Sequence, residues 1–119
     1  MSDPLADPEV GAGGPRKPTK GLPMYAAVRR YEGITDDAEA GRLVGESFIP
    51  QLEHVPGFIA YYWIDAGDGV MASLSVFEDK TGADESVRLA HQWVEENAAT
   101  LIPNAPQVTE GLVVASDTK

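Results

Sequence analysis

Two apolar segments joined by a short turn constrain the fold of this chain more than any other feature. Residues 58–66 and 70–77 are rich in aromatic and β-branched side chains, which favour β-strands. The turn between them, Gly67-Asp68-Gly69, has the residue types of a tight hairpin. The chain is therefore predicted to build a sheet around an antiparallel hairpin.

A strand and a helix are predicted before the hairpin. Residues 25–31 form a short segment with an aromatic side chain at each end, which suits a strand. Asp36 and Glu39 have the spacing of a capping box, and apolar residues then recur at three- and four-residue steps, as on one face of a helix. We expect Pro50 to kink this helix or end it early, and Pro56-Gly57 to stop it.

A second helix and a last strand are predicted after the hairpin. Thr81 and Asp84 again have capping-box spacing, and a strand is expected over 108–115. The resulting order is strand, helix, strand, strand, helix, strand. Two right-handed crossovers in this order predict an α+β protein with the ferredoxin-like βαββαβ fold, in which both helices cover one face of a four-stranded antiparallel sheet.

The 119 residues suit a single domain preceded by an arm. Residues 1–23 contain five of the nine prolines and four glycines, so they bury too little apolar surface to offset the entropy of ordering. We therefore predict a flexible arm over 1–23 and a folded domain over 24–119.

Charge and composition exclude several classes of partner. The net charge of −10 disfavours nucleic acid and anionic membranes, and no apolar stretch is long enough to span a membrane. With no cysteine and two histidines, we expect no metal site and no disulfide. The lack of cysteine and of a secretory signal at the start of the sequence favours a cytoplasmic protein.

Large apolar side chains on both faces of the hairpin predict a homodimer. Helices cover one face of such a sheet, and an exposed apolar patch on the other exceeds what a monomer tolerates. We expect a second copy to pack on it, sheet against sheet. With a two-residue turn, Tyr62 shares a face with Ser73, Ser75 and Phe77, whereas a three-residue turn mixes the two sets.

The segments around the hairpin resemble those of a known family. Val55-Pro56-Gly57-Phe58 before the second strand, and Ser75-Val76-Phe77-Glu78-Asp79 before the second helix, are similar to the antibiotic biosynthesis monooxygenase (ABM) family of the dimeric α+β barrel superfamily. The resemblance covers residues 24 to about 115. It implies a pocket between the sheet and the helices of one subunit. Relatives include cofactor-independent oxygenases of aromatic polyketides and quinols, and haem-degrading enzymes.

The residues that haem-degrading members use match this chain poorly. Those members have an asparagine on the first strand, a tryptophan at the end of the third and a histidine on the second helix. Here residues 25–31 contain no asparagine, Phe77 stands at the tryptophan position, and His91 lies on the second helix. We therefore expect no haem and no other bound cofactor.

His91 is the candidate catalytic residue, because it lies on or beside the apolar stripe of its helix and an imidazole can act as a base near neutral pH. The alternative is a histidine at the helix edge that bonds to a neighbour. Arg29 and Arg30 point to opposite faces, so one of them could hold an anion inside or could pair with a carboxylate. The candidate ligand-binding residues are Tyr62, Ser73, Ser75, Phe77 and Trp93, which could also serve only packing.

The sequence thus predicts a small homodimer that binds an apolar or aromatic small molecule. If it is an enzyme, the favoured reaction is oxygenation without a bound cofactor, with the substrate donating the electrons. The competing hypothesis is a non-catalytic dimer that binds a ligand or accompanies another protein.

Overall fold

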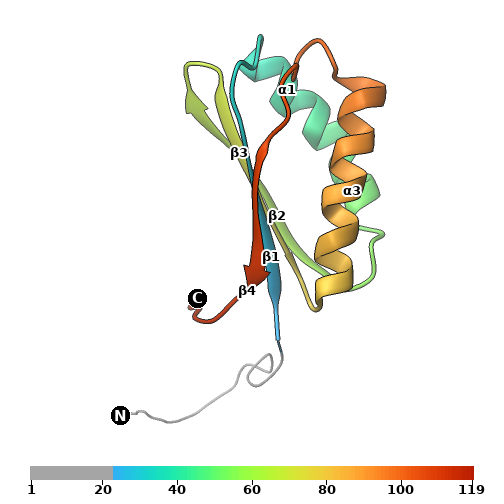
Figure 1. Ribbon diagram of the computed structural model, residues 1–119, viewed down its shortest axis with the longest axis vertical. Coiled ribbons are helices and arrows are strands. Elements are labelled where there is room, and N and C mark those ends of the chain that lie inside the picture. Colours follow the sequence, from blue (N-terminus) through green and yellow to red (C-terminus); the bar gives the residue numbers. More distant parts are fainter. Residues whose placement is uncertain (1–22) are drawn as a thin grey trace.

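The computed structural model describes residues 23–119, so the arm predicted over 1–23 lies outside the described residues except for Pro23. A four-stranded sheet has the order β2-β3-β1-β4, and every neighbouring pair is antiparallel. Two helical segments complete the domain (Figure 1). In chain order the elements are β1 (Tyr25–Tyr31), α1 (Asp37–Leu43), η1 (Val44–Phe48), α2 (Ile49–Leu52), β2 (Phe58–Gly67), β3 (Val70–Phe77), α3 (Lys80–Asn97) and β4 (Gln107–Leu112).

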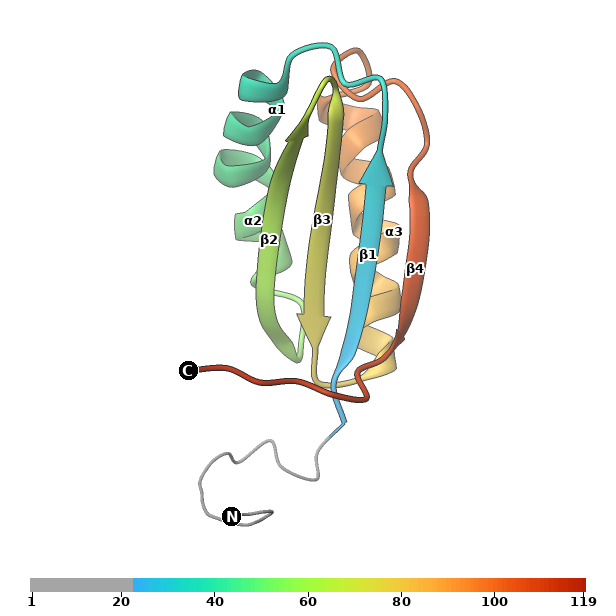
Figure 2. The ribbon, with the colours of Figure 1, turned by 90° about the vertical axis from the view of Figure 1, so that its left-hand side faces the viewer.

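Both helical segments lie on the same face of the sheet, and no helix of the described residues lies on the opposite face (Figures 1 and 2). The segment α1-η1-α2 lies over the β2 side, and α3 lies over the β1 and β4 side (Figure 2). This arrangement confirms the predicted α+β ferredoxin-like fold. No described helix is long and apolar enough to cross a membrane.

The first helix begins as predicted but passes through Pro50. The carboxylate of Asp36 accepts a hydrogen bond from the backbone N–H of Glu39 at 3.1 Å, which confirms the predicted cap. Of the two effects predicted for Pro50, a kink or an early end, the early end does not occur: the chain widens into the π-helical turn η1, and Pro50 falls in the first turn of α2, where proline is tolerated. The helix ends at Leu52, before Gly57 at φ 84°.

The second helix begins two residues earlier than a cap at Thr81 requires. Asp79 is its N-cap, and the Asp79 carboxylate accepts a hydrogen bond from the backbone N–H of Gly82 at 2.9 Å. The predicted Thr81–Asp84 capping box is therefore wrong, and both residues lie within the first turns of α3. Gly82 packs against Phe77 so closely that a Cβ atom at position 82 would lie 2.7 Å from Phe77 Cδ2.

A β-bulge corrects the predicted faces of the hairpin. Asp68 (φ 56°) and Gly69 (φ 78°) form a two-residue turn with both φ angles positive, as the prediction assumed. The register then shifts by one residue between Asp65 and Gly67. Tyr61 and Trp63 therefore pair with Ser75 and Ser73 and face the helices. Tyr62 is on the opposite face, which corrects the expectation that it shares a face with the two serines.

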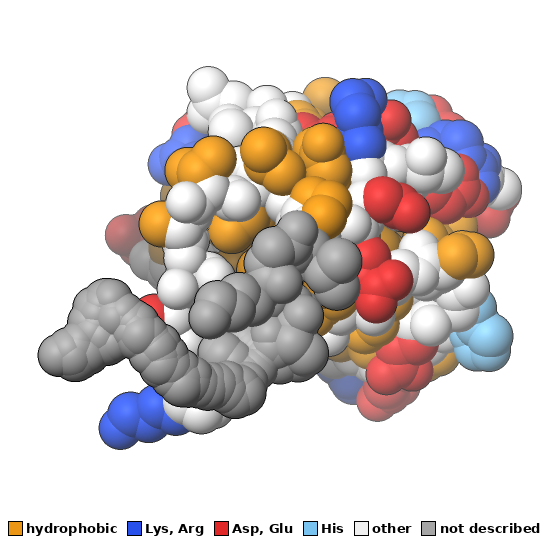
Figure 3. Space-filling model, turned by 90° about the horizontal axis from the view of Figure 1, so that it is seen from below, with side chains coloured by type: hydrophobic (Ala, Val, Ile, Leu, Met, Phe, Trp, Pro, Cys, Tyr) orange, Lys and Arg blue, Asp and Glu red, His pale blue; other side chains and the backbone are white. Residues whose placement is uncertain are grey.

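The helix-facing side of the sheet and the inner sides of the helices form the core. Its members include Tyr31, Val44, Phe48, Met71 and Phe77. On the helix-free face, Val28, Tyr62 and Ile64 are 40%, 59% and 49% exposed. Seen from below, acidic side chains concentrate on the helix side of the molecule, and apolar ones gather toward the sheet side (Figure 3). The second face of the sheet is therefore apolar, and none of residues 23–119 covers it.

Candidate functional site

A cavity of about 440 Å³ lies between α3, strands β1 and β4, and the segment that links α3 to β4. Its volume falls within the range of small-molecule sites. Arg29 and Tyr31 contribute its wall on the sheet, and Val94 and Ile102 its apolar helical side. His91 lies in the α3 wall.

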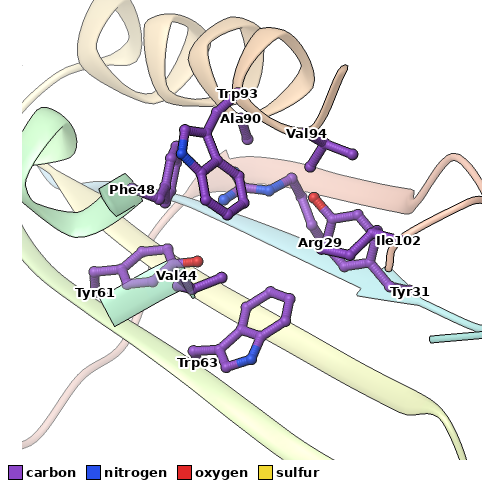
Figure 4. A pocket seen from close by; sticks show the side chains of 10 residues that line it. All are labelled: Arg29, Tyr31, Val44, Phe48, Tyr61, Trp63, Ala90, Trp93, Val94 and Ile102. Atoms are coloured by element: carbon purple, nitrogen blue, oxygen red, sulfur yellow. The ribbon is translucent and has the colours of Figure 1, made fainter. Parts of the chain in front are cut away.

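A second, inner cavity of about 10 Å³ lies deeper under the helices and is surrounded by aromatic side chains (Figure 4). It has room for about one water molecule. Four residues line both cavities: Arg29, Tyr31, Val94 and Ile102. The two cavities therefore share a wall, and Arg29 is the one charged residue in it.

Aromatic rings pack tightly around the inner cavity. The Phe48 ring centroid lies 5.6 Å from that of Tyr61 and 5.5 Å from that of Trp93. Tyr31 and Trp63 form another pair at 5.7 Å. Ring pairs at these separations contribute favourable electrostatic energy beyond the area that they bury. The aromatic side chains therefore enclose the inner cavity, which shares a wall with the larger one.

Arg29 is buried in this cluster without a counter-ion. The residue is 1% exposed, and neither Nε nor Nη1 has a hydrogen-bond partner in the part of the chain that the structure describes. Its Cζ atom lies 6.0 Å from the centroid of the Phe48 ring, which gives a cation–π contact. Among the described residues, every ion pair involves other side chains. Arg30, its neighbour, points the other way and pairs with Glu32.

Further unpaired polar atoms lie beside Arg29 on the sheet. The register places Ser73 directly between Arg29 and Trp63 across three strands, and Ser75 lies one step along, beside Tyr61. Within residues 23–119, three more buried polar atoms have no hydrogen-bond partner: Ser73 Oγ, Ser75 Oγ and Trp63 Nε1. Burial also raises the pKa of Tyr61 to about 12, an effect that the nearby charge of Arg29 opposes. Tyr61 is therefore a neutral phenol near neutral pH.

The structure separates the residues that the sequence suggested for the site. Trp93 lines the inner cavity and is 3% exposed. Ser73 and Ser75 lie on the helix-facing side, fully buried, but line neither cavity. Phe77, also fully buried, packs on Phe58 with ring centroids 5.8 Å apart, away from both cavities. Tyr62 projects from the opposite face of the sheet.

His91 lies at the outer wall of the larger cavity. Its side chain is 70% exposed, and its Nε2 lies 3.3 Å from an oxygen of Glu95, one helical turn further on. His91 therefore reaches the cavity from its solvent side. Within residues 23–119, no group of three histidine or acidic side chains gathers in a way that could hold a metal ion.

Several residues of the site were missed in the sequence. Tyr31 and Tyr61 were not among the candidate ligand-binding residues, although both fall on the same face as Arg29 once the strand register is known. Alternation along β1, where Ala27 and Tyr31 flank Arg29 at two-residue steps, is the signal that could have placed Tyr31. The face on which Tyr61 lies could not be predicted, because it depends on the β-bulge between Asp65 and Gly67.

A βαββαβ fold with a cavity under its helices defines an α+β protein of the ferredoxin-like class. Solved structures share this fold at low sequence identity. A protein of unknown function from Nitrosomonas europaea, NE2512, matches with a TM-score of 0.65 and 19% identity over 82% of this chain and 95% of its own. A candidate antibiotic biosynthesis monooxygenase from the same organism matches with a TM-score of 0.61 and 14% identity, over 76% and 90% of the two chains.

A third match is a monooxygenase from the gene ActVA-Orf6 of Streptomyces coelicolor, solved in complex with the ligand nanaomycin D. Its TM-score is 0.61 at 13% identity, over 82% of this chain and 93% of its own. No family model matches the sequence, and neither does any curated protein. The chain therefore has the fold of the antibiotic biosynthesis monooxygenases, which confirms the resemblance at the level of fold.

Proposed function

We propose that the protein is a cytoplasmic homodimer that binds an aromatic small molecule in the 440 Å³ cavity of each subunit and oxygenates it without a bound cofactor. One observation carries the proposal: a cavity of ligand size adjoins a buried aromatic cluster and a buried arginine. Apolar walls with a few convergent polar groups are typical of small-molecule sites. The monooxygenase that shares the fold supports the choice of reaction.

The helix-free face of the sheet supports the homodimer. Val28, Tyr62 and Ile64 on this face are each at least 40% exposed, and Ala72, Leu74 and Val76 lie among them in partly buried positions. Contiguous apolar patches of this kind mark association surfaces. A two-fold axis through the sheet would bury both copies of the patch against each other.

The proposed reaction needs a base and molecular oxygen, and the substrate supplies the electrons. A phenol with a free ring position would lose a proton and add O₂ at that carbon. Loss of water then leaves a quinone carbonyl, so one oxygen atom enters the ring and the other leaves as water. His91 is the proposed base, because it lies in the cavity wall and an imidazole can accept a proton near neutral pH.

The test is a screen of the purified protein against quinols, anthracene-type phenols and haem, following absorbance and the incorporation of ¹⁸O from labelled O₂. Once a substrate is known, we expect His91→Ala to lower kcat by about 10²-fold or more. His54→Ala is the matched control, because His54 is exposed and its Nδ1 lies 2.7 Å from the carbonyl oxygen of Pro50, away from the cavity. Unchanged turnover in His91→Ala would remove its role as base.

A non-catalytic ligand-binding dimer is the second candidate. The 70% exposure of the His91 side chain favours it, since catalytic bases act best where solvent is excluded. The discriminating measurement is the fate of a bound ligand incubated in air. A binding protein returns it unchanged, whereas an oxygenase converts it.

A further inference from the structure

The charge of Arg29 has no partner among the described residues. A buried cation without an anion is costly, and proteins seldom retain one unless a counter-charge is present when they function. The face of Phe48 offsets part of this cost, but a cation–π contact leaves the N–H donors free. The arginine therefore lacks acceptors for at least two of its donor nitrogens, Nε and Nη1.

The charged groups around the larger cavity do not supply the missing anion. Glu95 lies in its wall but pairs with His91 at 3.3 Å, on the solvent side. Arg88, also in the wall, is a second cation and bonds to Glu85 and Gln92. A ligand that enters from this side therefore meets positive charge at the inner wall, with one acidic group at the mouth.

We propose that the cavity binds an apolar, ring-containing molecule that carries a planar oxyanion, a carboxylate or a phenolate, and that Arg29 holds this oxyanion. The inference rests on the proposed ligand-binding function and adds the chemical class of the ligand. A guanidinium matches planar oxyanions in shape and charge, and a site of low dielectric strengthens the bond. Tyr31, Val94 and Ile102, which share the wall with Arg29, contact the apolar body.

The polar surroundings of Arg29 favour an oxyanion over a neutral carbonyl. Ser73, which is opposite Arg29 across the strand pair, has a buried hydroxyl with no hydrogen-bond partner among the described residues. Tyr61 offers a neutral phenol rather than a negative charge. A neutral ligand would leave the arginine charge unbalanced, whereas a monoanion balances it.

A matched pair of probes tests the proposal: 2-naphthoate and its neutral isostere 2-naphthamide, titrated by isothermal calorimetry into the full-length protein. We expect naphthoate to bind the wild type at least about 10-fold more tightly than the amide, the size typical of a charge-assisted hydrogen bond. Arg29→Met should abolish this preference and leave binding of the amide within about 3-fold, because the thioether keeps the length and apolar character of the side chain. Arg29→Lys should retain part of the preference.

Arg88→Met is the control for general positive charge, since Arg88 lines the same cavity but is exposed and already paired. It should keep the preference for naphthoate. Arg29→Met without ligand should resist urea at least as well as the wild type, because it removes a buried unpaired charge. A structural arginine would instead show a lower unfolding midpoint and an unchanged preference.

The outcomes separate the two proposals. Equal affinity of the wild type for both probes overturns the oxyanion inference and leaves ligand binding in place. A preference that survives in Arg29→Met also overturns it. If neither probe binds at about 1 mM, a weak limit for a specific site, both this inference and the proposed binding function fail.

Discussion

The indole of Trp93 on α3 donates a hydrogen bond from Nε1 to the hydroxyl of Ser47 in the π-helical turn, at 2.9 Å. The bond joins two helical segments that are 46 residues apart in sequence. Trp93 is 3% exposed and its ring packs against Phe48. The bond therefore helps to hold the Trp93 indole, which lines the inner cavity, against the first helical segment.

Ser47→Ala is expected to destabilise the protein by about 1–2 kcal/mol, because the indole N–H of Trp93 loses its acceptor in a buried site. Urea unfolding at a fixed protein concentration measures the effect. Ser116→Ala, in the exposed segment after β4, should be neutral. An unchanged unfolding midpoint in Ser47→Ala would mean that the bond adds nothing to stability.

Tyr62→Glu is expected to convert the homodimer into a monomer. The side chain is 59% exposed on the helix-free face, in the edge strand β2, and a second copy packed on this face would bury the added carboxylate against apolar side chains. Size-exclusion chromatography with light scattering gives the mass. Thr81→Glu, which adds the same charge in the first turn of α3, should leave the dimer intact. A wild type that is monomeric at high concentration contradicts the dimer.

Gly82→Ala is expected to destabilise the domain by about 2 kcal/mol or more, because the new methyl group would overlap a packed ring. Its Cβ would lie 2.7 Å from Phe77 Cδ2 and 3.0 Å from the carbonyl oxygen of Pro56. Gly45→Ala is the matched control within a helical segment, and its Cβ would meet nothing within 4 Å. That change should stabilise the protein by about 0.5–1 kcal/mol. Equal effects of the two substitutions would show that the contact with Phe77 is not close.

Stability is expected to fall between pH 10 and pH 12 through ionisation of Tyr61. Burial raises its pKa from 10.0 to about 12, so the unfolded chain loses this proton first. The stabilisation is complete below pH 10, is lost as the pH rises toward 12, and reaches at most about 2–3 kcal/mol.

Tyr61→Phe tests this by removing the ionising group, so its stability should decline less steeply over the same range. Urea unfolding at several alkaline pH values gives the slope. Tyr62→Phe is the control, because the Tyr62 side chain is exposed. If Tyr61→Phe and wild type decline in parallel, burial of the phenol does not control the alkaline slope.

The strands and their order were predictable because each relies on a local signal. The first strand, Tyr25–Tyr31, has the predicted bounds, and the third, Val70–Phe77, does as well. Asp36 caps the first helix as its spacing indicates. The last strand ends at Leu112, three residues earlier than predicted, since β4 is an edge strand that pairs with β1 alone.

The site was harder to predict because it depends on which face each side chain takes. A β-bulge leaves no clear signal in the sequence. The sequence therefore assigned the central side chains of β2 to the wrong faces, because the register is shifted by one residue. The sequence pattern did not distinguish Arg29 from Arg30. Only the structure shows that the Arg29 side chain is buried under the helices. His91 lies beside the apolar stripe of α3, as predicted, but on its solvent side.

The extra residue near the hairpin also affects how relatives of this chain can be compared. Between the bulges, residues 60–65 alternate between the aromatic interior and the apolar outer surface. Deleting one residue at the bulge between Asp65 and Gly67 would exchange the two faces of residues 60–65. Tyr62 would then face the helices, and Tyr61 and Trp63 would lie on the helix-free face. A single-residue gap at this point in an alignment therefore exchanges the residues that face the helices with those on the helix-free face, without any substitution. Positions on β2 of two relatives must be matched by the direction of their side chains.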